Sequence, residues 1–152
     1  MKIAIGCDEA GFYLKEIIKE FLKGKKIEVA DFGVHDIQPV FYPDIAVEVA
    51  QSVAKGHNER GILICGTGIG MAIVANKVPG IRAAVCHDCY SAERARKSND
   101  AQILTMGARI IGEELAKSLI DIWLASEFQG GGSTSKVNKI TEYEQKFLHE
   151  QD

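Results

Sequence analysis

Short apolar runs alternate with longer amphipathic segments along the whole chain. Each apolar run is rich in Ile, Val, Leu or Ala and has the length of a buried strand. These runs predict strands at 2–6, 27–32, 61–65, 82–86 and 102–106. Between them, apolar residues spaced by three and four positions predict helices at about 10–23, 44–55, 69–77, 90–97 and 112–126. The first helix is the clearest, because Leu14, Ile18 and Leu22 fall on one stripe.

The regular alternation of strands and helices predicts an α/β fold. Successive strand–helix–strand units form a parallel sheet through right-handed crossovers, which places helices on both faces. We therefore expect a Rossmann-like three-layer α/β/α sandwich with a five-stranded parallel sheet in the order 2-1-3-4-5. No linker or internal repeat divides the sequence, so residues 1–152 are predicted to form a single domain.

A flexible, glycine-rich passage precedes the last segment of the chain. Residues 129–135 read Gln-Gly-Gly-Gly-Ser-Thr-Ser, and the hydroxyl residues at their end are typical helix caps. A helix is predicted over about 135–148, with an apolar stripe of Val137, Ile140, Tyr143 and Phe147. Such a stripe needs burial. We expect residues 129–152 to be a C-terminal arm and helix that packs on a partner subunit, in a homodimer or a tetramer.

Composition and charge narrow the classes of function. The chain has a formal net charge of −3 and no run of basic residues, which argues against nucleic-acid binding and against adhesion to anionic lipid. No apolar stretch reaches the roughly 20 residues that a membrane span needs. Strand-like sequence begins at Lys2, which leaves no room for a signal peptide, so we expect a cytoplasmic protein with free thiols.

Four cysteines raise the question of a metal site. They are Cys7, Cys65, Cys86 and Cys89, all at or beside predicted strand ends. The segment Cys86-His87-Asp88-Cys89 offers two thiolates and one imidazole but no second Cys-x-x-Cys pair, which is too few ligands for a structural zinc site. We therefore expect neither a metal nor a cofactor.

Polar, glycine-containing segments follow the first and third predicted strands. The first strand leads into Cys7-Asp8-Glu9, and the third ends in Cys65-Gly66-Thr67-Gly68. In open parallel sheets, ligands bind beyond the carboxyl ends of the strands where the strand order reverses, so Asp8 and Cys65 should face each other there. Main-chain N–H groups of the glycine-rich loop can hold an anion or a developing oxyanion beside the thiol.

Three further segments are expected to border this site. His87 follows the fourth strand, Ser98 and Asn99 lie in the loop before the fifth strand, and the Tyr42-Pro43 turn can form a wall. Each feature also has a purely structural explanation, such as a buried cysteine, an aspartate helix cap, a loop histidine or an Asn-Asp turn. The glycine-rich loop has neither the spacing of a dinucleotide fingerprint nor the Lys-Ser/Thr of a Walker loop.

A set of motifs spread over the whole chain carries a family resemblance. They are Ile5-Gly6-Cys7-Asp8, Asp31-Phe32-Gly33, Tyr42-Pro43, the segments 61–70 and 75–83, Cys86-His87-Asp88, Tyr90-Ser91-Ala92, Asn99-Asp100 and Gly107-Ala108-Arg109. The combination resembles the ribose-5-phosphate isomerase B / galactose-6-phosphate isomerase family of aldose–ketose isomerases. The resemblance implies a Rossmann-like homodimer with an interfacial active site and no metal, acting on a small phosphorylated sugar of the ribose 5-phosphate/ribulose 5-phosphate type.

The resemblance also implies roles for individual residues. Cys65 would be the base that moves a proton between C1 and C2, while Thr67 and the loop amides would hold the enediolate oxygen. Asn99 would contact the reacting end, with Ser98 at the position usually assigned to ring opening. The substrate-binding set would comprise Asp8, Glu9, Tyr42, Gly66, Gly68, Ile69, Gly70, His87, Arg109 and Lys136.

The chain departs from the family pattern at the positions for phosphate binding and ring opening. Glu9 and Ser98 stand where the family usually has histidines, and Gly132 and Lys136 replace two arginines of the C-terminal arm. Fewer cations and an added carboxylate disfavour the usual phosphate pose. The alternative substrate is therefore a shorter, open-chain sugar phosphate such as erythrulose 4-phosphate. Alternatives of another class are a non-catalytic ligand-sensing domain and a nucleotide-binding module.

Overall fold

A parallel sheet of five strands forms the centre of the computed structural model, which describes residues 1–151. The strands are β1 (Lys2–Cys7), β2 (Glu28–Asp31), β3 (Arg60–Cys65), β4 (Ala83–Val85) and β5 (Ile103–Gly107). All paired strands run parallel, as predicted. Each predicted strand is present, although β2 and β4 are shorter than their apolar runs.

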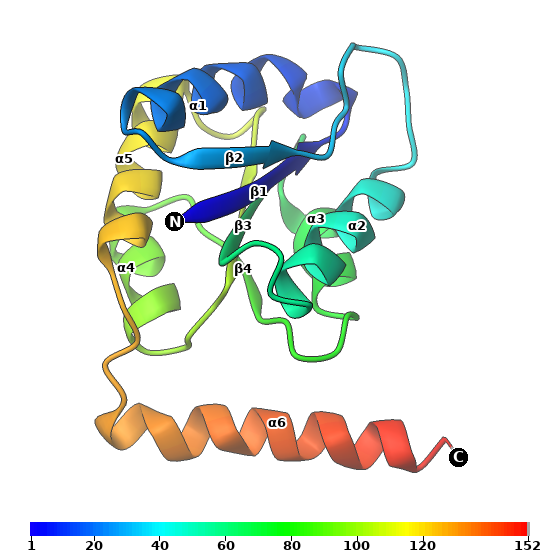
Figure 1. The fold of residues 1–152 in the computed structure, drawn as a ribbon, viewed down its shortest axis with the longest axis vertical. Helices are drawn as coiled ribbons and strands as arrows, with labels where there is room; N and C mark the ends of the chain where they lie inside the picture. The colour runs from blue at the N-terminus through cyan, green and yellow to red at the C-terminus, as the bar shows by residue number, and fades with distance from the viewer. Residues whose placement is uncertain (152) are drawn as a thin grey trace.

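Helices cover both faces of this sheet (Figure 1). They are η1 (Glu9–Gly11), α1 (Phe12–Gly24), α2 (Tyr42–Ala54), α3 (Ile69–Ala75), α4 (Cys89–Lys97), α5 (Glu113–Ala125), η2 (Gly131–Ser133) and α6 (Thr134–His149). α1, α4 and α5 lie on one face, and α2 and α3 lie on the other. The predicted three-layer α/β/α sandwich is therefore confirmed. None of the helices within residues 1–151 is long and apolar enough to span a membrane.

The hydrophobic core consists of two clusters, one on each face of the sheet. In the first, Leu22 of α1 and Trp123 of α5 pack with Ile62 of β3. In the second, Met71 of α3 packs with Leu63, the next residue of the same strand. Successive side chains of a strand point to opposite faces, and both faces are covered here. This is why β3 reads as an uninterrupted apolar run.

The strand order is β2-β1-β3-β5-β4, so the predicted order 2-1-3-4-5 is wrong at its last two positions. β5 lies between β3 and β4, and all of its residues are buried. β4 has only three residues, each partly exposed, which suits an edge strand. The reversal between β1 and β3 is as predicted, so the expected crevice at their carboxyl ends is present.

The C-terminal segment leaves α5 and ends in α6, which runs along the edge of the sheet where the strands begin (Figure 1). The Gly80 N–H, shortly before β4, donates a hydrogen bond to the Glu144 carboxylate of α6 at 3.0 Å. Val137 is buried, but Ile140, Tyr143 and Phe147 expose 50%, 51% and 56% of their surface. The apolar stripe of the predicted helix thus stays largely uncovered in this chain. Its packing on a partner subunit remains a prediction.

Candidate active site

The loop after β3 is held tightly against the end of β5. Gly68 has φ +76°, and a side chain there would place Cβ 2.7 Å from the main chain of Met106. Two hydrogen bonds fasten the same contact: Ala108 N–H donates to the Cys65 carbonyl at 2.8 Å, and Arg109 N–H donates to the Gly66 carbonyl at 3.0 Å. Glycine is therefore required here for a close approach of two main chains. The result is a rigid loop at the carboxyl edge of the sheet.

The thiol of Cys65 sits at the start of this loop and accepts a hydrogen bond from the main chain. The Gly68 N–H lies 3.0 Å from Cys65 Sγ. Cys65 exposes only 5% of its surface, yet it lines an open cleft together with Thr67. The thiolate is the form of cysteine that acts as base or nucleophile. Cys65 thus borders the cleft and receives a main-chain donor at its sulfur.

The cleft at Cys65 has a volume of about 400 Å³ and gathers residues from four parts of the chain. Asp8 follows β1, Tyr42 opens α2, Arg109 follows β5, and the remaining residues belong to the end of β3, the β3–α3 loop and α3. The lining is Asp8, Tyr42, Cys65, Gly66, Thr67, Ile69, Gly70, Ile73 and Arg109. Apart from Ile73, all of these were expected at the site from the sequence. Ile73 lies one helical turn after Ile69, a spacing that the sequence does display.

Asp8 has a structural role as well as a place in the cleft. Its Oδ1 accepts hydrogen bonds from the N–H groups of Ala10 and Gly11 at 3.0 and 3.1 Å, so it caps η1. Burial raises the pKa of the Asp8 carboxyl above its usual value, with a further contribution from the charge of Glu9, while the amide hydrogen bonds and Arg109 act in the opposite direction. The cap engages Oδ1, which leaves Oδ2 for a ligand.

Glu9 and Tyr42 position the wall of the cleft. Glu9 Oε2 accepts a hydrogen bond from the Val40 N–H at 3.2 Å, which ties the segment before α2 to the loop after β1. Tyr42 lies over Gly70, since a Cβ placed at Gly70 would be 2.5 Å from the Tyr42 hydroxyl oxygen. In this structure the Glu9 carboxylate therefore binds the protein's own main chain beside the cleft.

His87 lies behind the loop and not in the lining of the cleft. Its Nε2 accepts a hydrogen bond from the Gly107 N–H at 2.9 Å. Gly107 is the residue paired with Cys65 across β3 and β5. Because Nε2 accepts, the ring proton is assigned to Nδ1. The imidazole thus supports the end of β5 next to the thiol.

Ser98, Asn99 and Lys136 lie at the opposite edge of the sheet. Ser98 and Asn99 follow α4 and precede β5, whereas Cys65 is level with Gly107 at the end of β5. A strand of that length spans roughly 16 Å. Lys136 belongs to the first turn of α6, which runs along the same amino-terminal edge (Figure 1). One copy of the chain therefore does not bring these three residues to Cys65, contrary to the expected grouping of Ser98 and Asn99 with the strand ends.

The remaining cysteines do not form a metal site in the part of the chain that the structure describes. No group of three or more His, Cys, Asp or Glu side chains suited to a metal occurs within residues 1–151. Cys86 is buried and Cys89 is exposed, and both are free thiols. Burial raises the pKa of the Cys86 thiol to about 11.

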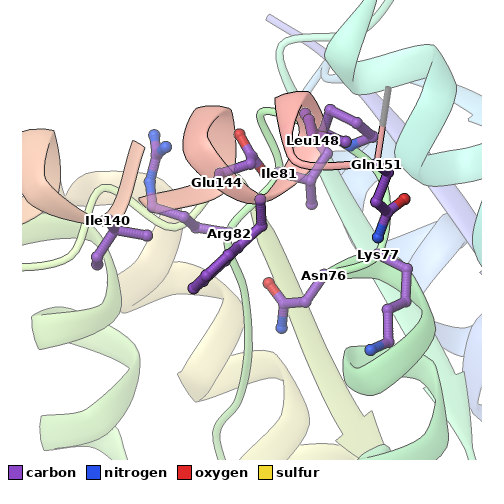
Figure 2. A pocket seen from close by; sticks show the side chains of 10 residues that line it. Asn76, Lys77, Ile81, Arg82, Ile140, Glu144, Leu148 and Gln151 are labelled. Atoms are coloured by element: carbon purple, nitrogen blue, oxygen red, sulfur yellow. The ribbon is translucent and has the colours of Figure 1, made fainter. Parts of the chain in front are cut away.

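A second cavity, of about 440 Å³, lies between α6 and the segment that joins α3 to β4 (Figure 2). Figure 2 shows Arg82, Lys77 and Glu144 around it, with Ile140 and Leu148 of α6. Neither a thiol nor an imidazole lines it. The cleft at Cys65 combines a thiol, a carboxylate, a guanidinium and a glycine-rich loop, so it is the better candidate for catalysis.

Comparisons with known proteins identify the family of the chain. Residues 3–140 match the family model described as Ribose/Galactose Isomerase. The chain is 60% identical over 146 residues to "Ribose-5-P isomerase B" of Listeria innocua (96% of this chain, 99% of that protein). It is 53% identical over 151 residues to "D-erythrulose-4-phosphate isomerase" of Pectobacterium atrosepticum (99% of each). The structure of ribose-5-phosphate isomerase B from Clostridium thermocellum matches with a TM-score of 0.95 and 52% identity, covering 97% of this chain and 99% of that one.

The family match spans most of the chain, and the relatives align over nearly their full lengths. The fold, the motif positions and the similarity point to the same class of enzyme. The chain therefore belongs to the ribose/galactose isomerase family and is an aldose–ketose isomerase, as its motifs predicted.

Proposed function

We propose that the chain interconverts the aldose and ketose forms of a small phosphorylated sugar, of the ribose 5-phosphate/ribulose 5-phosphate type, with Cys65 as the base. The observation that carries this proposal is the Cys65 sulfur, which receives the Gly68 N–H at 3.0 Å and lines the cleft. Proton abstraction next to a carbonyl needs a base at the carbon and donors at the oxygen. The cleft offers both within one loop.

The proposed reaction transfers one proton between neighbouring carbons. The Cys65 thiolate removes the proton from the carbon next to the carbonyl, and the electron pair moves onto the carbonyl oxygen to give a cis-enediolate. The thiol then returns its proton to the former carbonyl carbon, and the hydroxyl proton moves between the two oxygens, so nothing is oxidised or reduced overall. The Thr67 hydroxyl suits the oxyanion, because its Oγ1 accepts from the Ile69 N–H at 3.3 Å and its own proton is left to donate. The amides of Gly66 and Gly70 border the same space.

Charged residues in the cleft supply contacts for the rest of the sugar. Asp8 can accept from sugar hydroxyls through Oδ2, since its Oδ1 is used by the cap. Arg109 is the cation among the lining residues, and its Nη1 would lie 3.1 Å from a Cβ at Gly66, directly over the loop. A guanidinium at that place suits a phosphate or carbonyl oxygen.

We propose that a second copy of the chain completes the site. The support is the separation of Asn99, Ser98 and Lys136 from Cys65 within one chain, together with the uncovered apolar stripe of α6. In a homodimer these residues would approach the cleft of the partner. An assembly of two or four copies would also bury Ile140, Tyr143 and Phe147.

The substrate is proposed to be a pentose phosphate, with a tetrose phosphate as the second candidate. The relative from Listeria innocua is named a ribose-5-P isomerase, and the one from Pectobacterium atrosepticum a D-erythrulose-4-phosphate isomerase. Two features favour the shorter sugar: Ser98 provides no imidazole to open a ring, and the Glu9 carboxylate stands beside the cleft. Tetrose 4-phosphates cannot close a furanose ring through their phosphorylated hydroxyl.

Deuterium uptake tests the proposal directly. The purified protein is incubated in heavy water with ribose 5-phosphate, erythrulose 4-phosphate and a hexose 6-phosphate in parallel. We expect deuterium at the carbon next to the carbonyl for the pentose or the tetrose, and the faster of the two identifies the substrate. Absence of both deuterium exchange and aldose–ketose conversion with all three would contradict the isomerase proposal and favour the ligand-sensing domain.

A further inference from the structure

The turn that carries Asn99 has an unusual backbone conformation. Asp100 has φ +49°, and Lys26 is the one other non-glycine residue with a positive φ within residues 1–151. The Asp100 N–H donates to the Arg96 carbonyl at 3.2 Å, and the Ala101 N–H donates to the Ala95 carbonyl at 2.8 Å. This is the left-handed closure of a helix, at which glycine is the usual residue. Here an aspartate occupies the position.

The Asp100 carboxylate is held by two arginines from different elements. Arg96 of α4 places Nη1 3.1 Å from Oδ1, and Arg82, just before β4, places Nη2 3.2 Å from Oδ2. Arg82 Nε also donates to the Asp100 carbonyl at 3.0 Å, and Arg96 Nη1 donates to the Ala101 carbonyl at 3.0 Å. The two guanidiniums therefore bind both the side chain and the main chain of this turn. They offset the cost of the left-handed backbone.

The same contacts immobilise Asn99, which directly precedes Asp100. Its own N–H donates to the Arg94 carbonyl at 3.3 Å, so the main chain is fastened on both sides of the residue. Asn99 is nonetheless exposed. An exposed amide on a rigid, ion-paired turn has the properties of a group presented to another molecule. Catalytic groups must be held to within about 0.5 Å of their working geometry.

We infer that Asp100 is a positioning residue, which through Arg82 and Arg96 fixes Asn99 for use in the active site of a second copy of the chain. The inference rests on the proposed function, in which Asn99 reaches the partner's cleft. It assigns to Asp100 no contact with substrate. The effect of Asp100 on catalysis should therefore be transmitted entirely through Asn99.

A double-mutant cycle tests this inference. Asp100→Ala should lower kcat by about 10- to 100-fold, as expected for a displaced catalytic group, with KM changed less than about twofold. Asn99→Ala should lower kcat at least as much. In the Asn99→Ala background, adding Asp100→Ala should change kcat by less than about twofold, because the group that it positions is gone. A purely structural role for Asp100 would instead give multiplied losses in the double variant, and that outcome would overturn the inference.

Two controls keep the result interpretable. Asp121→Ala removes an ion pair of similar kind, to Lys25 at 2.6 Å, on the surface between α1 and α5, and should leave kcat unchanged. If Asp100→Ala does not fold, Asp100→Asn replaces it in the cycle, since asparagine tolerates the left-handed backbone but lacks the charge. A wild-type kcat in a folded Asp100 variant overturns this inference but leaves the proposed role of Asn99 intact. An unchanged kcat in Asn99→Ala overturns the proposed role of Asn99, and the inference with it, while leaving Cys65 as the base.

Discussion

Cys65 and Gly107 are paired across β3 and β5 at the carboxyl ends of the two strands. The pairing places the thiol where the glycine-rich loop and the Arg109 segment meet. The hydrogen bond from Gly107 N–H to His87 holds the end of β5 in place next to the thiol. The sulfur is thus positioned by main-chain contacts on two sides. This arrangement makes the role of Cys65 directly testable.

Replacement of Cys65 by alanine should abolish proton exchange while leaving the fold intact. The side chain is small, and the loop is held by main-chain hydrogen bonds that do not involve sulfur. We expect kcat to fall by about 10³-fold or more, the size typical of a lost general base. Deuterium uptake and circular dichroism measure the two effects. Cys89→Ser is the control, because Cys89 is exposed and lies outside the cleft; turnover of Cys65→Ala at the wild-type rate would remove Cys65 from the mechanism.

The four cysteines should differ sharply in their reactivity toward iodoacetamide. Burial raises the pKa of Cys7 to about 12 and that of Cys86 to about 11, so both remain neutral and shielded at pH 8. Cys89 is exposed and should react first. A bound sugar phosphate should slow labelling of Cys65 but not of Cys89. Mass spectrometry of the protein labelled in its native state measures the extent of labelling at each cysteine. Labelling of Cys7 as fast as Cys89 would contradict the expectation.

Gly68→Ala should damage both stability and activity. A Cβ at this position would lie 2.7 to 2.9 Å from the Met106 main chain, and φ +76° disfavours any side chain. We expect a loss of about 2 kcal/mol in the free energy of unfolding and a fall in kcat, because the Gly68 N–H would move away from the sulfur. Gly24→Ala is the matched control. It has free space around it at the end of α1 and should stabilise by about 0.5–1 kcal/mol. Urea denaturation compares the two, and a neutral Gly68→Ala would refute the argument from close approach.

Asp31→Asn should destabilise the protein in a pH-dependent manner. Lys15 is fully buried, and its Nζ lies 2.8 Å from both carboxylate oxygens of Asp31. Burial acts to raise the pKa of Asp31, but hydrogen bonds from Lys15 and Lys19 outweigh it and lower that pKa. Removing the carboxylate leaves the buried ammonium with the half-exposed Glu16 carboxylate, 3.4 Å away, and this loss costs about 3 kcal/mol at pH 7.

The sign of the pH effect follows from the lowered pKa of Asp31. The stabilisation is fully present above the unfolded pKa of about 4 and is lost as the pH falls through the lower pKa of the folded state. The stability difference between wild type and Asp31→Asn should therefore stay constant from pH 7 to 5 and shrink below pH 4. Denaturant titrations at pH 7, 5 and 3 measure it. A difference that grows on acidification would refute this account of the ion pair.

Glu9 variants distinguish a loop anchor from a residue that repels substrate. If the hydrogen bond to the Val40 N–H is what matters, Glu9→Gln should behave like the wild type, because the amide oxygen can accept the same bond. Glu9→Ala should then raise KM by about fivefold, the equivalent of one lost hydrogen bond. Steady-state kinetics with the sugar phosphate measure the KM of both variants and of the wild type. A lowered KM in both variants would show instead that the carboxylate repels the phosphate.

Much of the site was predictable because its signals are local. The glycine spacing after β3, the thiol at the strand end and the aspartate after β1 are adjacent in sequence to the strands that position them. Their meeting point follows from the reversal of strand order between β1 and β3. The orientation of Glu9 and His87 was not predictable, since each binds a main-chain N–H from a distant segment, Val40 or Gly107.

The α/β class, the parallel sheet and the cleft at Cys65 follow from the residues alone. The spacing of hydrophobic residues and the residue types at strand ends are each encoded over a few neighbouring positions. The relative places of β4 and β5 and the position of Lys136 on a helix along the far edge do not follow from them. Those features depend on which apolar run becomes buried on both sides, and that is settled by how all the helices and strands pack at once.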